Sequence, residues 1–140
     1  MNRIFVYLDK AIKEVYKEDM DIINDQSLNS VVFRVGLNLN SLLKRDIVYK
    51  DYYVDFNFKD KDIEYLDLVI HNRVTHQDLI AIKLTKDPNE IKNDIYTIKL
   101  ITEDLNDLAK HGVLIVLHKD CYNCYKLSPN YYKEEDDIIC

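Results

Sequence analysis

The chain has 140 residues, of which 47% are hydrophobic, and its formal net charge is −6 at pH 7. This length supports one domain with a buried core and is too short for two ordinary domains. No apolar run approaches the roughly 18 residues of a membrane span, and Asp9 interrupts the N-terminal apolar stretch too early for a secretory signal. We therefore expect a cytoplasmic domain without a membrane segment. The acidic balance also argues against a general nucleic-acid binder, which needs a concentrated basic surface.

Two amphipathic helices are predicted in the first third of the chain. Residues 4–18 place apolar side chains at helical spacing, with charged residues on the other faces. Residues 19–27 are polar and predict a turn. Ser27 or Asn29 can then cap a second helix that ends near Lys44.

Three strands are predicted next. Residues 47–58 are rich in β-branched and aromatic side chains, which favour a strand. Residues 63–71 and 78–84 are two short apolar runs. The polar residues between these two runs, 72–76, predict a hairpin or meander connection.

A helix and a buried strand complete the predicted core. Asp87 can cap this helix and Pro88 suits its first position. The helical pattern stops near residues 111–112, where Gly112 is a typical terminator. The unbroken apolar run 112–117 then predicts a fully buried strand. The order of helix, helix, three strands, helix and strand indicates an α/β fold.

The last part of the chain is rich in Tyr and Cys and becomes acidic. We interpret residues 121–140 as an appendage to a domain formed by residues 1–120. Cys121 and Cys124 form a Cys-x-x-Cys pair to which Cys140 could add a ligand, but a second pair at fixed spacing is missing. Zinc is therefore the weaker interpretation, and we expect no disulfide framework in a reducing compartment.

Two of the predicted strands carry a pattern that points to a known family. Residues 65–71 form a strand that carries Asp67, and residues 79–86 form an apolar strand that ends in a basic segment. With the order of elements over residues 4–118, they resemble the restriction-endonuclease-like superfamily, the PD-(D/E)xK nucleases. In that family one strand carries a metal-binding Asp, usually after Pro, a second carries Glu-x-Lys, and a helix and a buried strand follow. The resemblance implies N-terminal helices, a central mixed β-sheet and a following helix, with Leu66 where Pro is usual.

The motif departs from the family at the residues that carry its chemistry. Lys83 stands at the position of the Glu, and Thr85 at the position of the Lys. In the family the carboxylates hold Mg²⁺ and the lysine helps to activate the attacking water. A unit-charge pair at about 4 Å and an effective dielectric constant of about 20 is worth roughly 4 kcal/mol, so a cation in place of the Glu strongly opposes metal binding. The sequence therefore predicts a degenerate site.

A few residues remain candidates for chemistry if activity has survived. The resemblance then implies Asp67 as a catalytic and metal-binding residue, with Glu14 or Asp55 as a second acid. Lys83 or Lys86 would supply the cation, and Mg²⁺ would be the metal. The alternatives are ordinary structural roles, a cap or solvated charge for Asp67 and a surface position on a helix for Glu14.

The function that these features favour is binding rather than catalysis. No Gly-rich phosphate loop or HExxH helix is present, which excludes those enzyme classes. Eleven tyrosines without an accompanying basic run favour a protein interface over a nucleic-acid interface. One version is a phage or mobile-element inhibitor whose acidic surface docks on the basic channel of a nucleic-acid enzyme. Another is a homodimer formed through the apolar helices.

Overall fold

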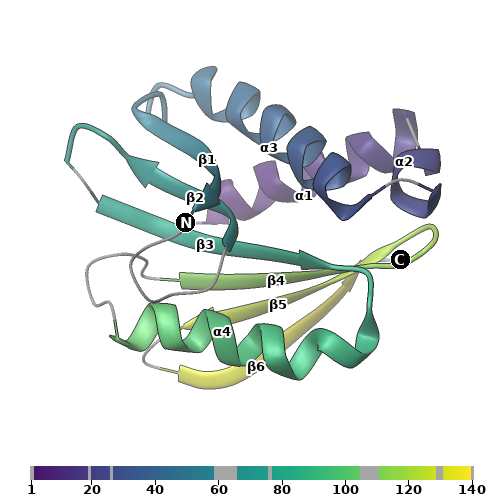
Figure 1. The fold of residues 1–140 in the computed structure, drawn as a ribbon. Coiled ribbons are helices and arrows are strands. Elements are labelled where there is room, and N and C mark those ends of the chain that lie inside the picture. Colours follow the sequence, from purple (N-terminus) through teal and green to yellow (C-terminus); the bar gives the residue numbers. More distant parts are fainter. Residues whose placement is uncertain are drawn as a thin grey trace.

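The computed structural model describes residues 2–18, 20–25, 27–58, 66–75, 77–104, 111–128 and 131–139. These residues form a mixed sheet of six strands with helices on both of its faces (Figure 1). The strands lie in the sequential order β1-β2-β3-β4-β5-β6, and the pair β3–β4 is parallel while every other neighbouring pair is antiparallel. The predicted α/β class, with N-terminal helices, a mixed sheet and a following helix, is confirmed.

Three helices cover one face of the sheet. They are α1 (Asn2–Glu18), α2 (Met20–Asp25) and α3 (Leu28–Lys44). The two long helices confirm the amphipathic patterns, and Ser27 occupies the N-cap position of α3. The prediction of a turn over residues 19–27 is wrong, because most of that segment is α2. The adjacent residues Ile22 and Ile23 of α2 explain the difference. Ile23 is almost fully buried in the same core as α1 and α3, and Ile22 packs against that core.

The first strand begins later than the sequence pattern predicts. β1 spans Tyr52–Phe58, whereas the residues just before it form hydrogen-bonded turns. The Asp46 carboxylate accepts the Val48 N–H at 2.9 Å, and the Asp46 carbonyl oxygen accepts the Tyr49 N–H at 3.1 Å. Arg3 also pairs with Asp46 at 3.0 Å. The hydrogen bonds within the turn, together with the Arg3–Asp46 pair, outweigh the β-propensity of residues 47–49.

The next strands form the predicted antiparallel meander. β2 spans Leu66–Asn72 and β3 spans Gln77–Thr85. Asn72 stabilises their connection, because its side-chain oxygen accepts the N–H groups of Val74 and Thr75.

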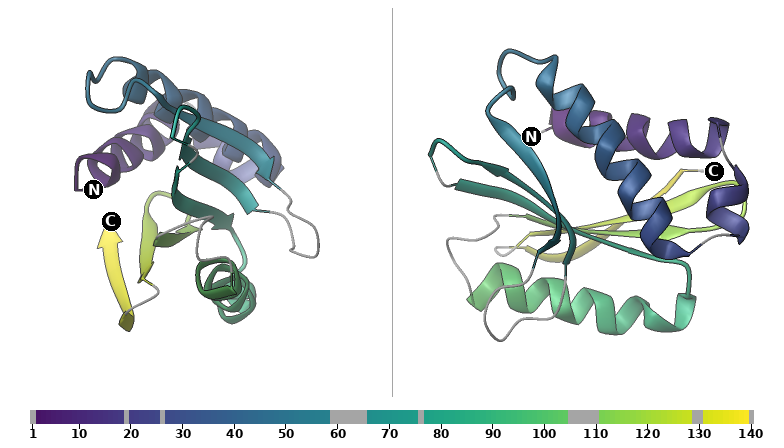
Figure 2. Two further views of the ribbon diagram at one scale, coloured as in Figure 1. Left: turned by 90° about the vertical axis from the view of Figure 1, so that its left-hand side faces the viewer. Right: turned by 45° about the horizontal axis from the view of Figure 1, so that its top comes forward.

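A helical crossover joins the parallel strands. Asp87 caps a short 3₁₀ helix, η1 (Pro88–Glu90), by accepting the Asn89 N–H at 2.9 Å. α4 (Ile91–Asp104) follows directly, and the chain returns as β4 (His111–Leu117), which is almost completely buried. α4 lies on the opposite face of the sheet from α1, α2 and α3 (Figure 2). The predicted continuation of this helix over residues 105–110 lies outside the described residues.

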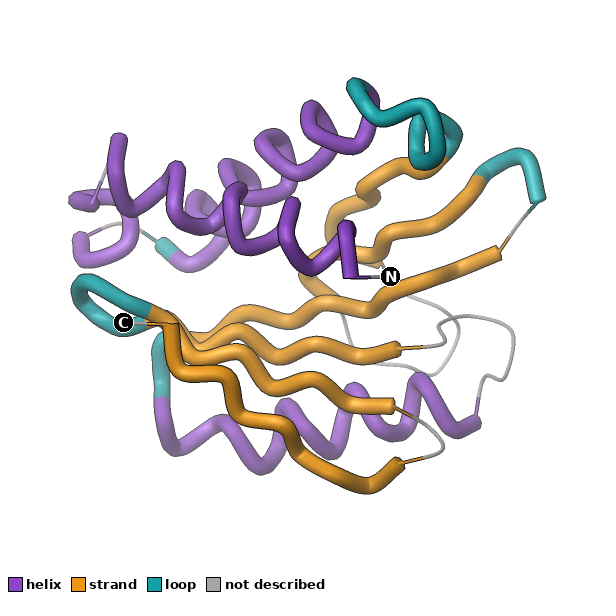
Figure 3. The backbone as a smooth tube through the Cα atoms, turned by 180° about the vertical axis from the view of Figure 1, so that it is seen from behind, coloured by secondary structure: helices purple, strands orange, loops and turns teal. Residues whose placement is uncertain are grey.

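The segment predicted as an appendage contributes two strands to the same sheet. β5 (Tyr122–Ser128) pairs with β4, and β6 (Tyr131–Ile139) pairs with β5 (Figure 3). The Tyr122 side chain is buried in the α1/α3 core, and its hydroxyl donates to the Asp9 carboxylate of α1. The Tyr16 hydroxyl of α1 lies 2.7 Å from the carbonyl oxygen of Cys121, so α1 is tied to this end of the sheet.

The sheet lies between two apolar layers. The larger core packs α1 and α3 against the inward-facing residues of β2, β3 and β4, and the smaller one packs α4 against β4. None of the described helices has the length and apolar character needed to cross a membrane.

Candidate functional site

Asp67 lies on β2, on the face of the sheet that α4 covers. Its neighbours along the strand, Leu68 and Ile70, point into the opposite core. The Asp67 carboxylate accepts the backbone N–H of Leu84 on β3 at 2.7 Å. Because the β2–β3 pairing begins only at Leu68 and Ile82, this carboxylate takes the place of a missing ladder partner. The structure thus gives Asp67 a capping role.

Lys83 projects from β3 on the same face and meets an acid from α4. Its Nζ atom lies 3.7 Å from the Asp94 carboxylate, and the two side chains are 20% and 10% exposed. The sequence interpretation missed Asp94. A signal for it was present, because Asp94 falls inside the apolar face of α4 between Ile91 and Ile98, where a charged residue must be buried.

Burial dominates the electrostatics of both acids. It raises the pKa of Asp67, while the Leu84 N–H and the charge of Lys83 oppose the rise. It also raises the pKa of Asp94, where Lys83 again opposes it and Glu90 and Asp67 add to it. Lys83 therefore acts on both carboxylates, and Asp67 in turn acts on Asp94. We call Asp67, Lys83 and Asp94 the β2–β3–α4 cluster.

Thr85 and Lys86 complete the end of β3. Thr85 is buried, and its hydroxyl oxygen accepts the Asp87 N–H at 3.1 Å. Thr85 therefore stabilises the turn that leads into α4. Lys86 lies one residue beyond β3 and is partly buried.

The two other acids proposed as metal ligands lie elsewhere. Glu14 belongs to α1, on the opposite face of the sheet from Asp67. Asp55 is on β1, where Arg73 donates to its carboxylate at 2.8 Å and His71 forms a second, very short contact. The structure thus brings Asp67 together with Lys83 and separates it from Glu14.

The candidate zinc ligands do not form a matched thiolate pair. Cys121 is disulfide-bonded, although the sequence predicted no disulfide framework, whereas Cys124 is a buried cysteine outside a disulfide. A disulfide sulfur has no thiolate to offer a metal. Within the described residues, no group of three or more His, Cys, Asp or Glu side chains is arranged to hold a metal ion.

Comparisons with known proteins add no family to this geometry. No protein-family model matches the chain, and no curated protein is significantly similar to it. The chemistry of the β2–β3–α4 cluster must therefore be argued from its own residues.

The raised pKa of Asp67 makes a pH-dependent prediction. The folded state binds this proton more tightly than the unfolded state, so the contribution of Asp67 to stability is greatest below the ordinary pKa of 3.8 and is lost as pH rises through the raised value. Asp67→Asn keeps an acceptor for the Leu84 N–H and removes the charge. Relative to the original protein, its free energy of unfolding should therefore increase between about pH 4 and about pH 7.

Urea denaturation across that pH range measures the difference. Asp51→Asn, at an exposed acid in the turn before β1, controls for the loss of one negative charge. A difference between Asp67→Asn and the original protein that stays constant with pH would contradict the assignment.

Proposed function

We propose that this protein is a catalytically degenerate protein with a restriction-endonuclease-like core, and that it acts by binding a protein partner. The order of N-terminal helices, three antiparallel strands, a helix and a parallel strand supports the resemblance. The observation that carries the proposal is the position of Lys83. Its ammonium group lies 3.7 Å from Asp94, and its charge opposes the rise that burial causes in the pKa values of Asp67 and Asp94.

The charge of Lys83 explains why catalysis is not expected. In the family a carboxylate at this position helps to hold Mg²⁺, which requires oxygen ligands. Here the ammonium group already compensates Asp94, and a divalent cation would have to overcome repulsion from it. Thr85 supplies no cation to activate water.

The apolar surface of α3 supports a protein as the partner. Phe33 and Leu37 lie one turn apart on this helix and are 53% and 47% exposed. Phe33 also stacks against Phe56 of β1, with ring centroids 5.6 Å apart. Exposed aromatic and aliphatic side chains in one place are typical of protein interfaces. The net charge of −6 favours a partner with a basic surface, such as a nucleic-acid-processing enzyme that this protein would inhibit.

An active nuclease with a migrated site is the alternative, and Asp94 favours it. Asp67, Asp94 and Lys83 are two acids and one lysine, the residue types that the resemblance requires, in a different order. In this alternative the two carboxylates would hold Mg²⁺ and Lys83 would assist the attacking water.

Two measurements distinguish these functions. The purified protein should leave single- and double-stranded DNA and RNA intact with Mg²⁺ or Mn²⁺, and a stoichiometric protein should be recovered with it from host lysate.

Leu37→Asp should abolish that recovery, because it places a charge in the apolar surface of α3. Val6→Asp, at a residue of α1 that is 50% exposed, is the matched control and should retain the partner. Metal-dependent cleavage that disappears in Asp67→Ala would instead establish the nuclease.

A further inference from the structure

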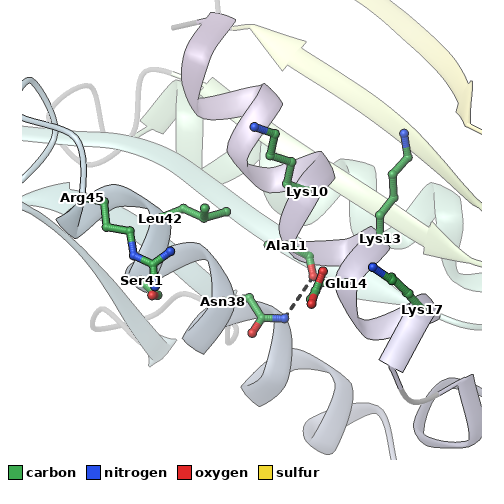
Figure 4. Close-up of a pocket in the computed structure, with 9 residues that line it drawn as sticks. All are labelled: Lys10, Ala11, Lys13, Glu14, Lys17, Asn38, Ser41, Leu42 and Arg45. Atoms are coloured by element: carbon green, nitrogen blue, oxygen red, sulfur yellow. Dashed lines mark hydrogen bonds between the residues drawn. The ribbon is translucent and has the colours of Figure 1, made fainter.

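A basic groove lies between α1 and α3 (Figure 4). These helices cover the opposite face of the sheet from the β2–β3–α4 cluster. Its volume is about 480 Å³. The α1 side contributes Lys10, Lys13, Glu14 and Lys17, and the α3 side contributes Ser41 and Arg45 among others. Among the described residues, four cations and one acid therefore line this groove, in a protein whose net charge is −6.

Two of these cations are available to a ligand. Lys13 pairs with Asp9 at 3.0 Å. Lys17 interacts electrostatically with Glu18: Glu14 raises the pKa of Glu18, and the positive charge of Lys17 opposes that rise. Within the described residues, the side chains of Lys10 and Arg45 have no hydrogen-bond or ion-pair partner. An unpaired lysine and arginine at one groove create a local positive potential that an anion can neutralise.

The dimensions and the lining favour a small ligand. Lys10 and Lys17 are seven residues apart on α1, which corresponds to about 10 Å along the helix. The volume lies within the range of about 300–1,000 Å³ that is typical of small-molecule sites. The described residues that line the groove include no aromatic side chain, so they offer no platform on which nucleic-acid bases could stack.

The density of positive charge favours phosphate over carboxylate groups. An extended peptide places about three residues in 10 Å, and alternate side chains point away from the groove. Such a peptide could therefore present about two carboxylates, whereas each phosphate group brings up to two negative charges. Phosphate oxygens also match the donors of Lys10 and Arg45.

We propose that this groove binds a small molecule that carries two or more phosphate groups, with Lys10 and Arg45 as the principal contacts. Glu14 limits the affinity, because its carboxylate lines the same groove and repels phosphate. The assignment is independent of the proposed nuclease-like ancestry, since none of its residues belongs to the β2–β3–α4 cluster.

Isothermal titration of the full chain with inorganic tripolyphosphate tests the proposal. Lys10→Met and Arg45→Met should each weaken binding by about tenfold or more, because each removes a charge-assisted contact. Glu14→Gln should tighten binding, an effect that damage to the fold would not produce. Lys92→Met removes an exposed lysine from α4, on the other side of the sheet, and should leave the affinity unchanged.

Three results would overturn the proposal. One is the absence of binding at millimolar tripolyphosphate. Another is an equal loss of affinity in Lys92→Met, which would indicate a general charge effect. The third is tighter binding of a single-stranded oligonucleotide than of tripolyphosphate, with the same dependence on Arg45, because the groove would then be a nucleic-acid site.

Discussion

Lys83→Met is expected to lower the free energy of unfolding by about 1–3 kcal/mol at neutral pH. Methionine retains much of the apolar length of lysine and fills similar space, so the main loss is the positive charge. Asp94 would remain in a setting that is 10% exposed, without the cation that lies 3.7 Å from it. Asp67 would lose the same favourable charge, and the repulsion between the two carboxylates would no longer be compensated.

The pH dependence of this loss identifies its cause. Both carboxyl pKa values are already raised by burial, and removing Lys83 should raise them further. The destabilisation should therefore be largest at neutral pH and should shrink as pH falls and the two acids become protonated. Urea denaturation at neutral and at mildly acidic pH measures both values. A loss of stability that did not change with pH would indicate a packing defect.

Two companion variants isolate the role of charge. Lys92→Met removes an exposed lysine from α4 and should change stability by no more than about 0.5 kcal/mol. Lys83→Met combined with Asp94→Asn should recover part of the loss, because one of the two uncompensated acids becomes neutral. Mn²⁺ should raise the melting temperature of Lys83→Met more than that of the original protein, since the two carboxylates then lack an internal cation.

The sequence predicted those elements whose apolar pattern is strong and local. α1 and α3 carry apolar residues at helical spacing, and β4 is an unbroken apolar run, so burial of each was visible in the chain. β6 was not predicted because residues 133–137 are all charged, and such residues are depleted in strands. Its structure depends on backbone pairing with β5, which a local pattern does not contain.

The candidate site was predictable along the strands but not across the sheet. Asp67 and Lys83 come from adjacent strands, and the meander pattern was sufficient to place them near each other. Asp94 is distant in sequence from Asp67 and reaches the cluster only because α4 crosses over the parallel pair β3–β4. Glu14 lies apart from Asp67 because α1 covers the opposite face of the sheet, and the sequence pattern does not show which face each helix covers.

Gly36 shows a similar dependence on contacts between distant segments. As a helix residue it costs about 1 kcal/mol relative to alanine, and the sequence alone offers no reason for it within α3. The fold supplies the reason, because a Cβ atom at Gly36 would lie 2.4 Å from Cζ of Phe56 and 2.9 Å from a methyl carbon of Leu68. Both distances are well inside van der Waals contact. The glycine thus allows α3 to approach β1 and β2 closely.

Gly36→Ala should therefore destabilise the protein by about 1–3 kcal/mol, although alanine is the better helix former. The added methyl group must displace the Phe56 ring, which also stacks on Phe33. Ser41→Ala, at an exposed position of the same helix, controls for helix propensity and should be neutral or slightly stabilising. Gly36→Ala should cost much less in a Phe56→Leu background, because the ring atoms that obstruct the new methyl group are then absent. Equal costs in the two backgrounds, measured by urea denaturation, would show that Phe56 is not what excludes a side chain at this position.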